Sequence, residues 1–234
     1  MASVPIPFES GDVKSMFDRL VPGYDRFNRL SSLGLDRRWR QAMVKKIPQG
    51  VRILDVGTGT GDTALLASPG AARVVGVDFS SRMVEAAKRK TTGDQPLHWH
   101  VADASHLPFK SGSFDVLTSS FVLRNLYRLD LLNASFQEAC RVLTRGGRLL
   151  ALDLTRPQST VIGWGHRLYM GTFLPLVGKT LFGKKWPGTY LRTSIREFPE
   201  STEILGRLED AGFTRARYTP LSGGIAGIFS AFKA

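Results

Sequence analysis

The 234-residue sequence predicts an α/β fold built on a mostly parallel sheet of seven strands with an antiparallel final hairpin. Between Val51 and Leu154, short apolar runs alternate with stretches of helical periodicity, which is the pattern of βαβ units. A glycine-rich turn follows the first apolar run, where a parallel strand would pass into a helix. Two apolar runs near the C-terminus are close enough in sequence to pair as a hairpin. We therefore expect helices on both faces of the sheet.

Each predicted element has its own local signal. Apolar residues at helical spacing predict a helix that begins at Ser80 or Ser81, either of which can cap it. Two further helices are expected over Asp130 to Leu143 and over Ser201 to Gly212. The strands are short apolar runs bounded by turn residues or by these helical stretches. The predicted strands are Val51–Val56, Arg73–Asp78, Leu97–Val101, Phe114–Ser119, Arg148–Leu154, Arg215–Thr219 and Ile225–Phe232.

The chain is expected to form a single domain over residues 1–234, because no repeat or low-complexity linker divides it. Residues 1–50 have apolar residues at helical spacing and predict an N-terminal helical cap. Residues 51–155 carry the βαβ pattern and form the core. Residues 156–196 are rich in basic and aromatic residues and predict a lid that includes an inserted helix–loop–helix. Residues 197–234 supply the C-terminal helix and hairpin.

Composition excludes several protein classes. An apolar content of 42% with 22% charged residues is that of a globular protein, not a disordered one. The single cysteine excludes a disulfide framework, and no apolar run approaches the ~20 residues of a spanning helix. His98 and His100 share a strand face, but no cysteine or carboxylate set accompanies them, so we expect no metal site. The sequence thus predicts a cytoplasmic protein, peripheral to a membrane at most.

The net charge of +12 is concentrated outside the predicted core. The stretch from Leu154 to Arg196 contains seven basic residues and no acidic one. A basic surface of this kind can bind nucleic acid, an anionic membrane or an acidic ligand. Aromatic residues such as Trp164, Tyr169 and Phe173 lie among the cations, which favours a membrane surface slightly over an ordinary core.

Acidic residues accompany the glycine-rich turn at the ends of the predicted strands. The turn runs from Asp55 to Asp62, and glycines at alternate positions allow the backbone to approach a ligand closely. Asp78 ends the second strand and could accept hydrogen bonds from ribose hydroxyls. Asp103 follows the third strand and is suited to accept from an adenine amine; taken alone, it could equally cap a helix. These features indicate a nucleotide-type cofactor.

Two cofactors compete for this turn. The segment from Gly59 to Ala64 satisfies the dinucleotide pattern G-x-G-x-x-A. However, Asp55 and Asp62 flank the loop, and a pyrophosphate is disfavoured next to carboxylates. A cationic sulfonium with an amino-acid tail suits them better, since Asp55 could bridge to its ammonium group. Together with Asp78 and the acid after the third strand, the loop favours S-adenosyl-L-methionine by a wide margin.

At this level of detail the chain resembles the UbiE/MenG family of C-methyltransferases, which methylate the ring of demethylmenaquinol or of a ubiquinol precursor. The resemblance runs nearly end to end. The segments that resemble this family in particular are Met16-Phe17, Tyr24-Asp25, Asn28, Gly34–Trp39, Ser120–Asn125, Tyr190-Leu191 and Ser194–Arg196. Further segments match class I methyltransferases in general: Leu107–Phe109, Phe114-Asp115, Arg141–Leu143 and Gly146–Arg148. The resemblance implies a Rossmann-like class I methyltransferase fold that uses S-adenosylmethionine and no metal.

The resemblance also implies where the cofactor binds. The family's cofactor positions match Thr60, Asp78, Asp103, Ala104 and Ser120 of this chain. The full predicted cofactor site combines these with the loop and the strand ends: Asp55, Gly57, Thr58, Gly59, Thr60, Gly61, Asp78, Phe79, Met83, Asp103, Ala104, Ser119 and Ser120.

The chain departs from the family pattern at several positions. Asp103 replaces a common asparagine but keeps an acceptor, and Val122 replaces a usual glycine, from which we expect a narrower ring pocket. The segment from Thr160 to Lys185 diverges from the family pattern, so the sequence does not determine which ring the substrate carries.

Methylation of a phenolic ring carbon requires that the neighbouring hydroxyl lose its proton, because the phenolate charge then delocalises onto that carbon. Arg124 follows the fourth strand and is assigned to stabilise that charge, with Asn125 orienting the hydroxyl or a water. A structural ion pair is the less favoured role for Arg124. Arginine cannot serve as the base, so the proton is expected to leave through water towards Tyr24 or Asp153.

The expected substrate is therefore a polyprenyl quinol, foremost demethylmenaquinol, reached at the inner face of an anionic membrane. The alternative substrates are a benzoquinol precursor of ubiquinone, methylated on carbon, and another phenol, methylated on carbon or oxygen. A homodimer is also compatible with the sequence. A nucleic-acid methyltransferase is disfavoured because the fourth strand is followed by Ser119-Ser120-Phe121-Val122 and not by the Asn/Asp-Pro-Pro-aromatic motif of base amine methylation. A binding module without catalysis is disfavoured by the polar pair Arg124-Asn125. We expect no nucleic-acid partner.

Overall fold

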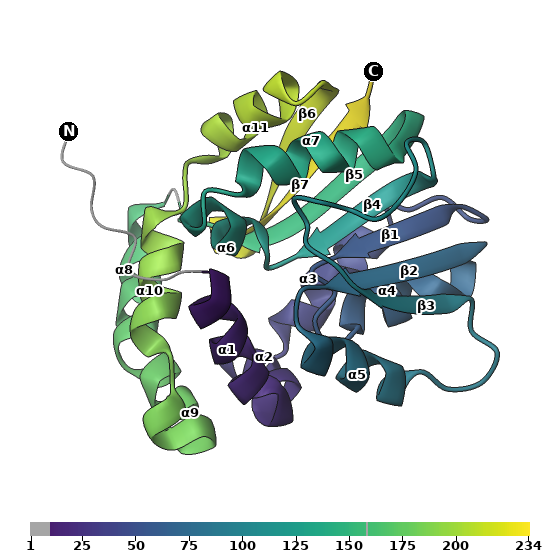
Figure 1. Cartoon of the computed structure of the whole chain (residues 1–234). Helices are drawn as coiled ribbons and strands as arrows, with labels where there is room; N and C mark the ends of the chain where they lie inside the picture. The colour runs from purple at the N-terminus through teal and green to yellow at the C-terminus, as the bar shows by residue number, and fades with distance from the viewer. Residues whose placement is uncertain (1–9, 158) are drawn as a thin grey trace.

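A seven-stranded sheet forms the centre of the computed structural model, which describes residues 10–157 and 159–234. Its strand order is β3-β2-β1-β4-β5-β7-β6 (Figure 1). The first five strands in this order are mutually parallel, and β7 is antiparallel to both of its neighbours. The predicted fold class is thereby confirmed. The strands are β1 Arg52–Val56, β2 Arg73–Asp78, β3 Leu97–Val101, β4 Phe114–Ser120, β5 Leu143–Leu154, β6 Phe213–Leu221 and β7 Ala226–Lys233.

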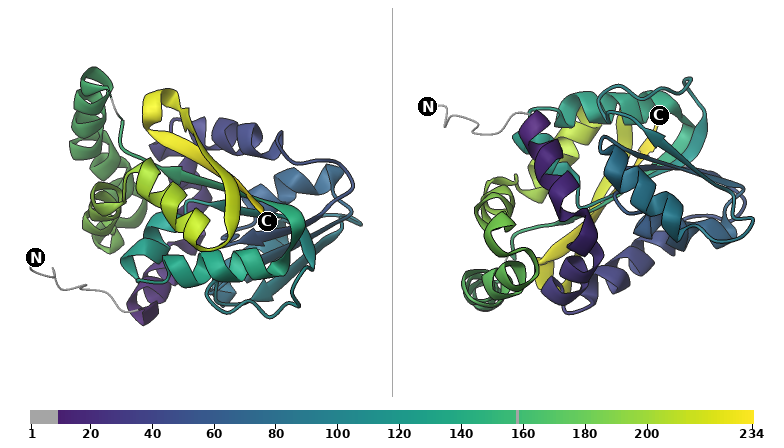
Figure 2. Two further views of the ribbon diagram at one scale, coloured as in Figure 1. Left: turned by 90° about the horizontal axis from the view of Figure 1, so that it is seen from above. Right: turned by 60° about the horizontal axis from the view of Figure 1, so that its bottom comes forward.

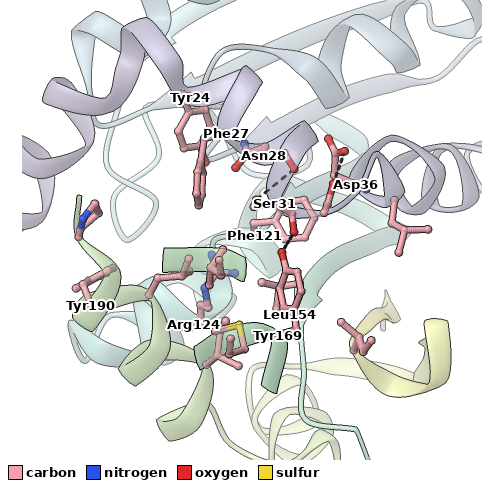
Figure 3. Close-up of a pocket in the computed structure, with 18 of the residues that line it drawn as sticks. Tyr24, Phe27, Asn28, Ser31, Asp36, Phe121, Arg124, Leu154, Tyr169 and Tyr190 are labelled. Atoms are coloured by element: carbon pink, nitrogen blue, oxygen red, sulfur yellow. Dashed lines mark hydrogen bonds between the residues drawn. The ribbon is translucent and has the colours of Figure 1, made fainter. Parts of the chain in front are cut away.

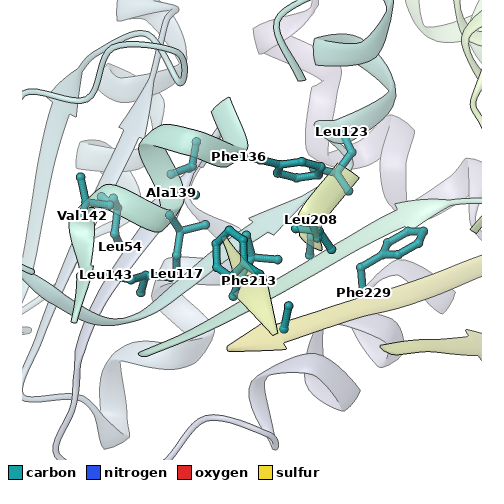
Figure 4. Close-up of a cluster of buried hydrophobic side chains, with 14 of the residues drawn as sticks. Leu54, Leu117, Leu123, Phe136, Ala139, Val142, Leu143, Leu208, Phe213 and Phe229 are labelled. Carbon is teal, nitrogen blue, oxygen red and sulfur yellow. The ribbon is translucent and has the colours of Figure 1, made fainter. Parts of the chain in front are cut away.

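Buried apolar side chains cover both faces of the sheet. Successive residues of a strand point to opposite sides, so a continuous apolar run supplies both faces. Leu54 of β1 belongs to one buried cluster, and its neighbour Ile53 belongs to the other. The first cluster packs under helices α6 (Leu123–Arg128), α7 (Leu132–Val142) and α11 (Ser201–Asp210) (Figure 4). The second packs under α3 (Leu35–Val44) and α4 (Asp62–Ala67).

Helix α5 (Ser81–Lys90) follows β2 on the same side of the sheet as α4 (Figure 1). The Ser80 hydroxyl caps it by accepting a hydrogen bond from the Met83 backbone nitrogen at 3.1 Å. The expected cap is confirmed.

Three helices precede the sheet, in agreement with the predicted N-terminal cap: α1 (Ser10–Leu20), α2 (Tyr24–Ser31) and α3. The first nine residues of the expected cap lie outside the described residues. Helices α1 and α2 stand beside the lid at one end of the sheet (Figures 1 and 2). Their apolar side chains form a third cluster with Tyr190 of the lid. The N-terminal and lid segments are therefore packed against each other although they are distant in sequence.

The lid contains three α-helices, so the helix–loop–helix predicted within it is too simple. They are α8 (Thr160–Gly171), α9 (Phe173–Phe182) and α10 (Gly188–Glu197). Trp186, between α9 and α10, packs on Phe27 of α2 with ring centroids 4.8 Å apart. This aromatic residue is therefore partly buried between the lid and the N-terminal cap. No helix in the described parts of the chain has the length and apolar character needed to cross a bilayer.

Two strands are longer than the sequence predicts. Strand β5 begins at Leu143, which pairs with Phe114, and the register then shifts before Arg148 pairs with Val116. Strand β6 likewise begins before Arg215, where a second register shift occurs. The register shift within β5 is an irregularity of the bulge type, which preserves strand pairing on both of its sides. Asp130 also lies before α7, so that helix starts later than expected.

Close packing at the middle of β2 generates the first testable prediction. A Cβ added at Gly76 would lie 2.5 Å from Trp99 Cε3 and Cζ3. Because overpacking of a core typically costs about 1–3 kcal/mol, Gly76→Ala should lower the free energy of unfolding by about that amount in urea denaturation. Gly206→Ala on α11 is the matched control, since nothing lies within 4 Å of its added Cβ. Equal stability of the two variants would contradict this account.

Candidate active site

The predicted cofactor residues meet at one edge of the sheet. Parallel strands place their carboxyl ends at a common edge, where ligands of α/β sheets bind. The glycine loop leaves β1 there, Asp78 ends β2, Asp103 follows β3 and Ser120 ends β4. The order of the strands thus sets these groups side by side in the order Asp103, Asp78, glycine loop, Ser120.

The glycine loop has a backbone that other residues would strain. Gly57, Gly59 and Gly61 have φ angles of +65°, +56° and +87°, a region that L side chains disfavour. A Cβ at Gly57 would also lie 2.4 Å from Val122 Cγ2. Glycine is therefore required at these positions by the backbone conformation and, at Gly57, also by close packing against Val122.

Asp78 fastens this loop to β2. Its carboxylate accepts hydrogen bonds from the backbone nitrogens of Gly59 at 2.8 Å and Ser80 at 3.0 Å. Burial raises the pKa of Asp78 to about 6, although these two hydrogen bonds oppose the shift. Each carboxylate oxygen keeps one further acceptor site, so Asp78 can also accept from a vicinal diol.

Asp55 lies behind the loop. Its two oxygens accept from the hydroxyls of Thr58 and Thr118, both at 2.6 Å, and burial raises its pKa. The neighbouring Ser119 hydroxyl donates to the Val56 carbonyl. Asp55, Thr58 and Ser119 are not among the residues that line the cavity, so the structure does not favour the expected bridge from Asp55 to an ammonium group. These side chains hold the loop instead.

Thr60 joins the loop to the N-terminal cap. Its hydroxyl donates to Asp25 of α2 at 2.5 Å and accepts from Lys90 Nζ at 3.0 Å. Lys90 also pairs with Asp25 at 2.5 Å and with Asp62 at 2.8 Å. Gly61 packs against Trp99. Neither Thr60 nor Gly61 lines the cavity, so the described geometry assigns both to the support of the loop.

A cavity of about 100 Å³ lies over this edge of the sheet. Val13 and Phe17 of α1 line its other side, so the N-terminal cap helps to enclose it. Val122 also lines this cavity and does not line the larger one described next. The predicted cofactor residues that line the cavity are Gly57, Gly59, Asp78, Phe79, Met83, Asp103, Ala104 and Ser120.

Asp103 combines a local structural contact with a place in the wall of the cavity. Its Oδ1 accepts from the backbone nitrogen and the hydroxyl of Ser105, each at 2.8 Å, which stabilises the turn after β3. The residue also lines the cavity. It is therefore positioned to present a carboxylate to a ligand while it caps the turn.

A second, apolar cavity of about 330 Å³ adjoins the first (Figure 3). Its walls come from the N-terminal helices, the segment after β4 and the lid helices. Polar groups are few and come from Tyr24, Asn28, Arg124, Asn125 and a small number of further residues. A large apolar volume with a few convergent polar groups is the usual character of a small-molecule site.

Four residues line both cavities and so mark their boundary: Phe17, Tyr24, Phe121 and Asn125. Phe121 has a φ of +64°, a conformation that is strained for an aromatic residue and that clusters at functional sites. Two predicted catalytic residues, Tyr24 and Asn125, therefore lie where one bound molecule would meet another.

Tyr24 is partly buried at this boundary. Burial raises the pKa of its hydroxyl, while a hydrogen bond to Asn28 and the charges of Arg40 and Arg124 offset part of the shift. The phenol is thus protonated at neutral pH. It can donate or relay a proton, but it is a poor proton acceptor in its resting state.

Arg124 forms a buried ion pair with Asp153. Arg124 Nη1 lies 2.5 Å from Asp153 Oδ1, and the Arg124 backbone nitrogen donates to the other carboxylate oxygen. The structural ion pair that the sequence disfavoured is therefore present. Arg124 nevertheless lines the apolar cavity, and its Nε is buried with no hydrogen-bond partner among the described residues. Asp153 does not line either cavity.

Sequence reasoning assigned no role to several residues of the apolar cavity. Tyr190 donates to Asn125 Oδ1 at 3.1 Å and so orients that amide. The Tyr169 hydroxyl donates to the Ser31 carbonyl and links the lid to the N-terminal cap (Figure 3). Tyr190 belongs to a segment already noted for its family resemblance, whereas Tyr169 was noted only among the aromatic residues that favour a membrane surface. No cluster of three or more metal-ligating side chains occurs in the parts of the chain that the structure describes.

The strand order, the antiparallel β7, the glycine loop and the acidic strand ends together define a class I S-adenosylmethionine-dependent methyltransferase. A solved S-adenosylmethionine-dependent methyltransferase from Thermotoga maritima has the same fold, with a TM-score of 0.67 and 21% identity over 94% of this chain and 99% of that one. The chain belongs to the ubiE/COQ5 methyltransferase family, whose model matches residues 7–233.

Relatives in this family are similar over nearly their whole length. The ubiquinone/menaquinone biosynthesis C-methyltransferase UbiE of Geotalea uraniireducens is 37% identical over 94% of this chain and 96% of its own. The demethylmenaquinone methyltransferase of Deinococcus radiodurans is 38% identical over 93% and 90%. The predicted family is thereby confirmed.

The raised pKa of Asp78 predicts a specific pH dependence. Because its folded-state pKa of about 6 exceeds its ordinary value of 3.8, the folded state binds more protons between these values, and stability falls as pH rises through this window. Asp78→Asn has no such titration. The stability of wild type relative to this variant should therefore fall by about 2–3 kcal/mol between pH 4 and pH 7. Parallel stability curves in chemical denaturation would show that the Asp78 pKa is not raised.

Proposed function

We propose that this protein transfers a methyl group from S-adenosylmethionine to a ring carbon of demethylmenaquinol. The observation that carries the proposal is the apolar cavity of about 330 Å³ that shares Tyr24, Phe121 and Asn125 with the cofactor-side cavity. An apolar ring and the start of its polyprenyl tail fit such a volume. The names of the relatives, which refer to demethylmenaquinone and to ubiquinone/menaquinone biosynthesis, support the substrate class.

The residues of the cofactor-side cavity suit this methyl donor. Gly57 and Gly59 line the cavity beside the place that the donor would occupy, and the Asp78 carboxylate has free acceptor sites for the ribose diol. Asp103 would accept from the adenine amine. When bound, the donor supplies a methyl group on a positively charged sulfur. Asp55 and Thr60 would act by holding the loop in place.

Residues at the boundary would activate and orient the quinol. Asn125, fixed by Tyr190 on one side and donating weakly to the Phe121 carbonyl on the other, would hold the hydroxyl beside the reacting carbon. Tyr24 would relay the departing proton and not retain it, since burial keeps its hydroxyl protonated. Holding the reacting atoms within about 3–3.5 Å of each other lowers the activation barrier of the methyl transfer substantially.

Arg124 would stabilise the phenolate that forms when the quinol loses its proton. Its ion pair with Asp153 balances part of its charge and fixes its orientation, while Arg124 itself lines the apolar cavity where the substrate would lie. Asp153 would then act as a positioning residue behind Arg124. Because the ion pair already orients the guanidinium of Arg124, that group would need little reorganisation when negative charge develops in the transition state.

The lid and the N-terminal cap would dock on an anionic membrane, from which a polyprenyl quinol could enter. Leu33, which lines the apolar cavity, is 71% exposed. Trp164 and Leu168 lie one helical turn apart on α8 and are also exposed, as is Leu176 of α9. Exposed cations such as Lys179 accompany them. Aromatic and aliphatic side chains among cations suit a lipid interface.

The substrate proposal is tested by product identification. Wild-type protein, labelled S-adenosylmethionine and matched demethylmenaquinol and benzoquinol acceptors would be incubated under reducing conditions, and the products identified by mass spectrometry. Label should appear on a ring carbon of the naphthoquinol. Preferential labelling of the benzoquinol would move the proposal to a ubiquinone precursor, and labelling on oxygen would overturn C-methylation.

The role of Arg124 is separable from its ion pair. Arg124→Ala leaves Asp153 buried without its counter-charge, which should cost about 3–5 kcal/mol of stability. The double variant Arg124→Met/Asp153→Asn removes both charges and should recover most of that loss. Its turnover should remain about 10²–10³-fold below wild type if Arg124 stabilises the phenolate. Recovery of turnover together with stability would leave Arg124 with a structural role only.

Membrane docking is tested with liposomes. Two cations contribute about 1 kcal/mol each at an anionic surface, so Lys179→Glu/Lys184→Glu should reduce co-sedimentation at least about 30-fold. High salt should also reduce co-sedimentation, because it screens the attraction between the cations and the anionic surface. Lys88→Glu/Lys110→Glu is the matched control, because these exposed lysines lie away from the lid. Equal binding to neutral and anionic vesicles would contradict the proposal.

A further inference from the structure

Arg40 of α3 is a buried cation without a partner carboxylate. Its exposed fraction is 7%, and none of the ion pairs formed by the described residues includes it. Its guanidinium lies over the Phe121 ring, 5.0 Å from the centroid, and its Nε has no hydrogen-bond partner among those residues. Burying a charge without a partner costs free energy, which suggests a function for it.

A chain of hydroxyls leads from Arg40 to the cofactor-side cavity. Arg40 Nη1 donates to Thr63 Oγ1 at 2.6 Å, and Thr63 Oγ1 lies 2.9 Å from Ser120 Oγ. Arginine can only donate, so Thr63 accepts from it and can pass its own hydrogen to Ser120. The Ser120 hydrogen is then left for an acceptor in the cavity, which Ser120 lines.

The place of Ser120 in the sheet indicates which part of the donor it meets. This step rests on the proposed cofactor site. The groups for adenine and ribose come from the ends of β3 and β2, whereas Ser120 ends β4 on the other side of the glycine loop. The remaining part of S-adenosylmethionine is the sulfonium with its amino-acid tail. The tail carboxylate is the donor's only anion, so it is the acceptor that a cation favours.

We propose that Arg40 is a positioning residue for the methyl donor, acting through Thr63 and Ser120 to favour the tail carboxylate. Asp55 is the acidic group whose pKa the Arg40 charge lowers, although burial dominates that pKa and raises it. Both Asp55 oxygens are already engaged by threonine hydroxyls. The positive charge of Arg40 is thus available to an anion that enters the cavity.

The test compares two ligands that differ by one carboxylate: S-adenosylhomocysteine and its decarboxylated analogue. A hydrogen bond to a charged group is worth a factor of roughly 10 to 100 in affinity. Arg40→Met and Thr63→Val should each lose about 10-fold or more for S-adenosylhomocysteine by calorimetry. Binding of the decarboxylated analogue should change less than about 2-fold. Arg38→Met, exposed on the same helix, is the matched control and should bind both ligands normally.

Equal weakening of both ligands would assign Arg40 a purely architectural role and overturn the proposal, as would unchanged affinity in either variant. Without ligand, Arg40→Met should melt at or above the wild-type temperature, because an unpaired buried charge is removed. If that variant fails to fold, Thr63→Val and the charge-retaining Arg40→Lys carry the test. No quinol is present in the assay, so failure of the substrate proposal leaves this result unaffected.

Discussion

The attachment of the glycine loop to the Asp78 carboxylate is the interaction on which the rest of the site depends. The backbone nitrogens of Gly59 and Ser80 donate hydrogen bonds to the Asp78 carboxylate, which is almost fully buried. The cost of that burial raises the pKa of Asp78, so the protein retains an acid in a place that disfavours its charge. This attachment fixes the loop relative to β2 and sets the floor of the cofactor-side cavity.

The second cavity depends on segments that lie outside the βαβ core. The cap and the lid enclose it by packing on each other, with Phe27 against Trp186 and Ser31 against Tyr169. Lys90 and its two acidic partners connect the same cap to the glycine loop. A movement of the N-terminal helices would therefore affect both cavities. This coupling explains how one chain can bring a polar donor and an apolar acceptor to a common boundary.

Two buried arginines have different electrostatic situations near that boundary. Arg124 has a full counter-charge in Asp153 and is therefore oriented but largely neutralised. Arg40 has only a hydroxyl and an aromatic face. Both charges lower the pKa of Tyr24 against the stronger effect of burial. A region that holds two cations and a partly buried phenol is prepared for a bound anion, and this agrees with chemistry in which a phenolate forms.

The sequence by itself determined the sheet, the glycine loop and the acidic strand ends, because βαβ periodicity and chain order place those groups at one edge. It could not decide which loop residues face the ligand. Asp55 and Thr60 carry the expected residue types, but their hydrogen bonds turn them into supports. It also could not pair Arg124 with Asp153, since that contact joins helix α6 to the end of strand β5, 29 residues apart. Long-range packing decides such contacts, and only the tertiary structure contains it.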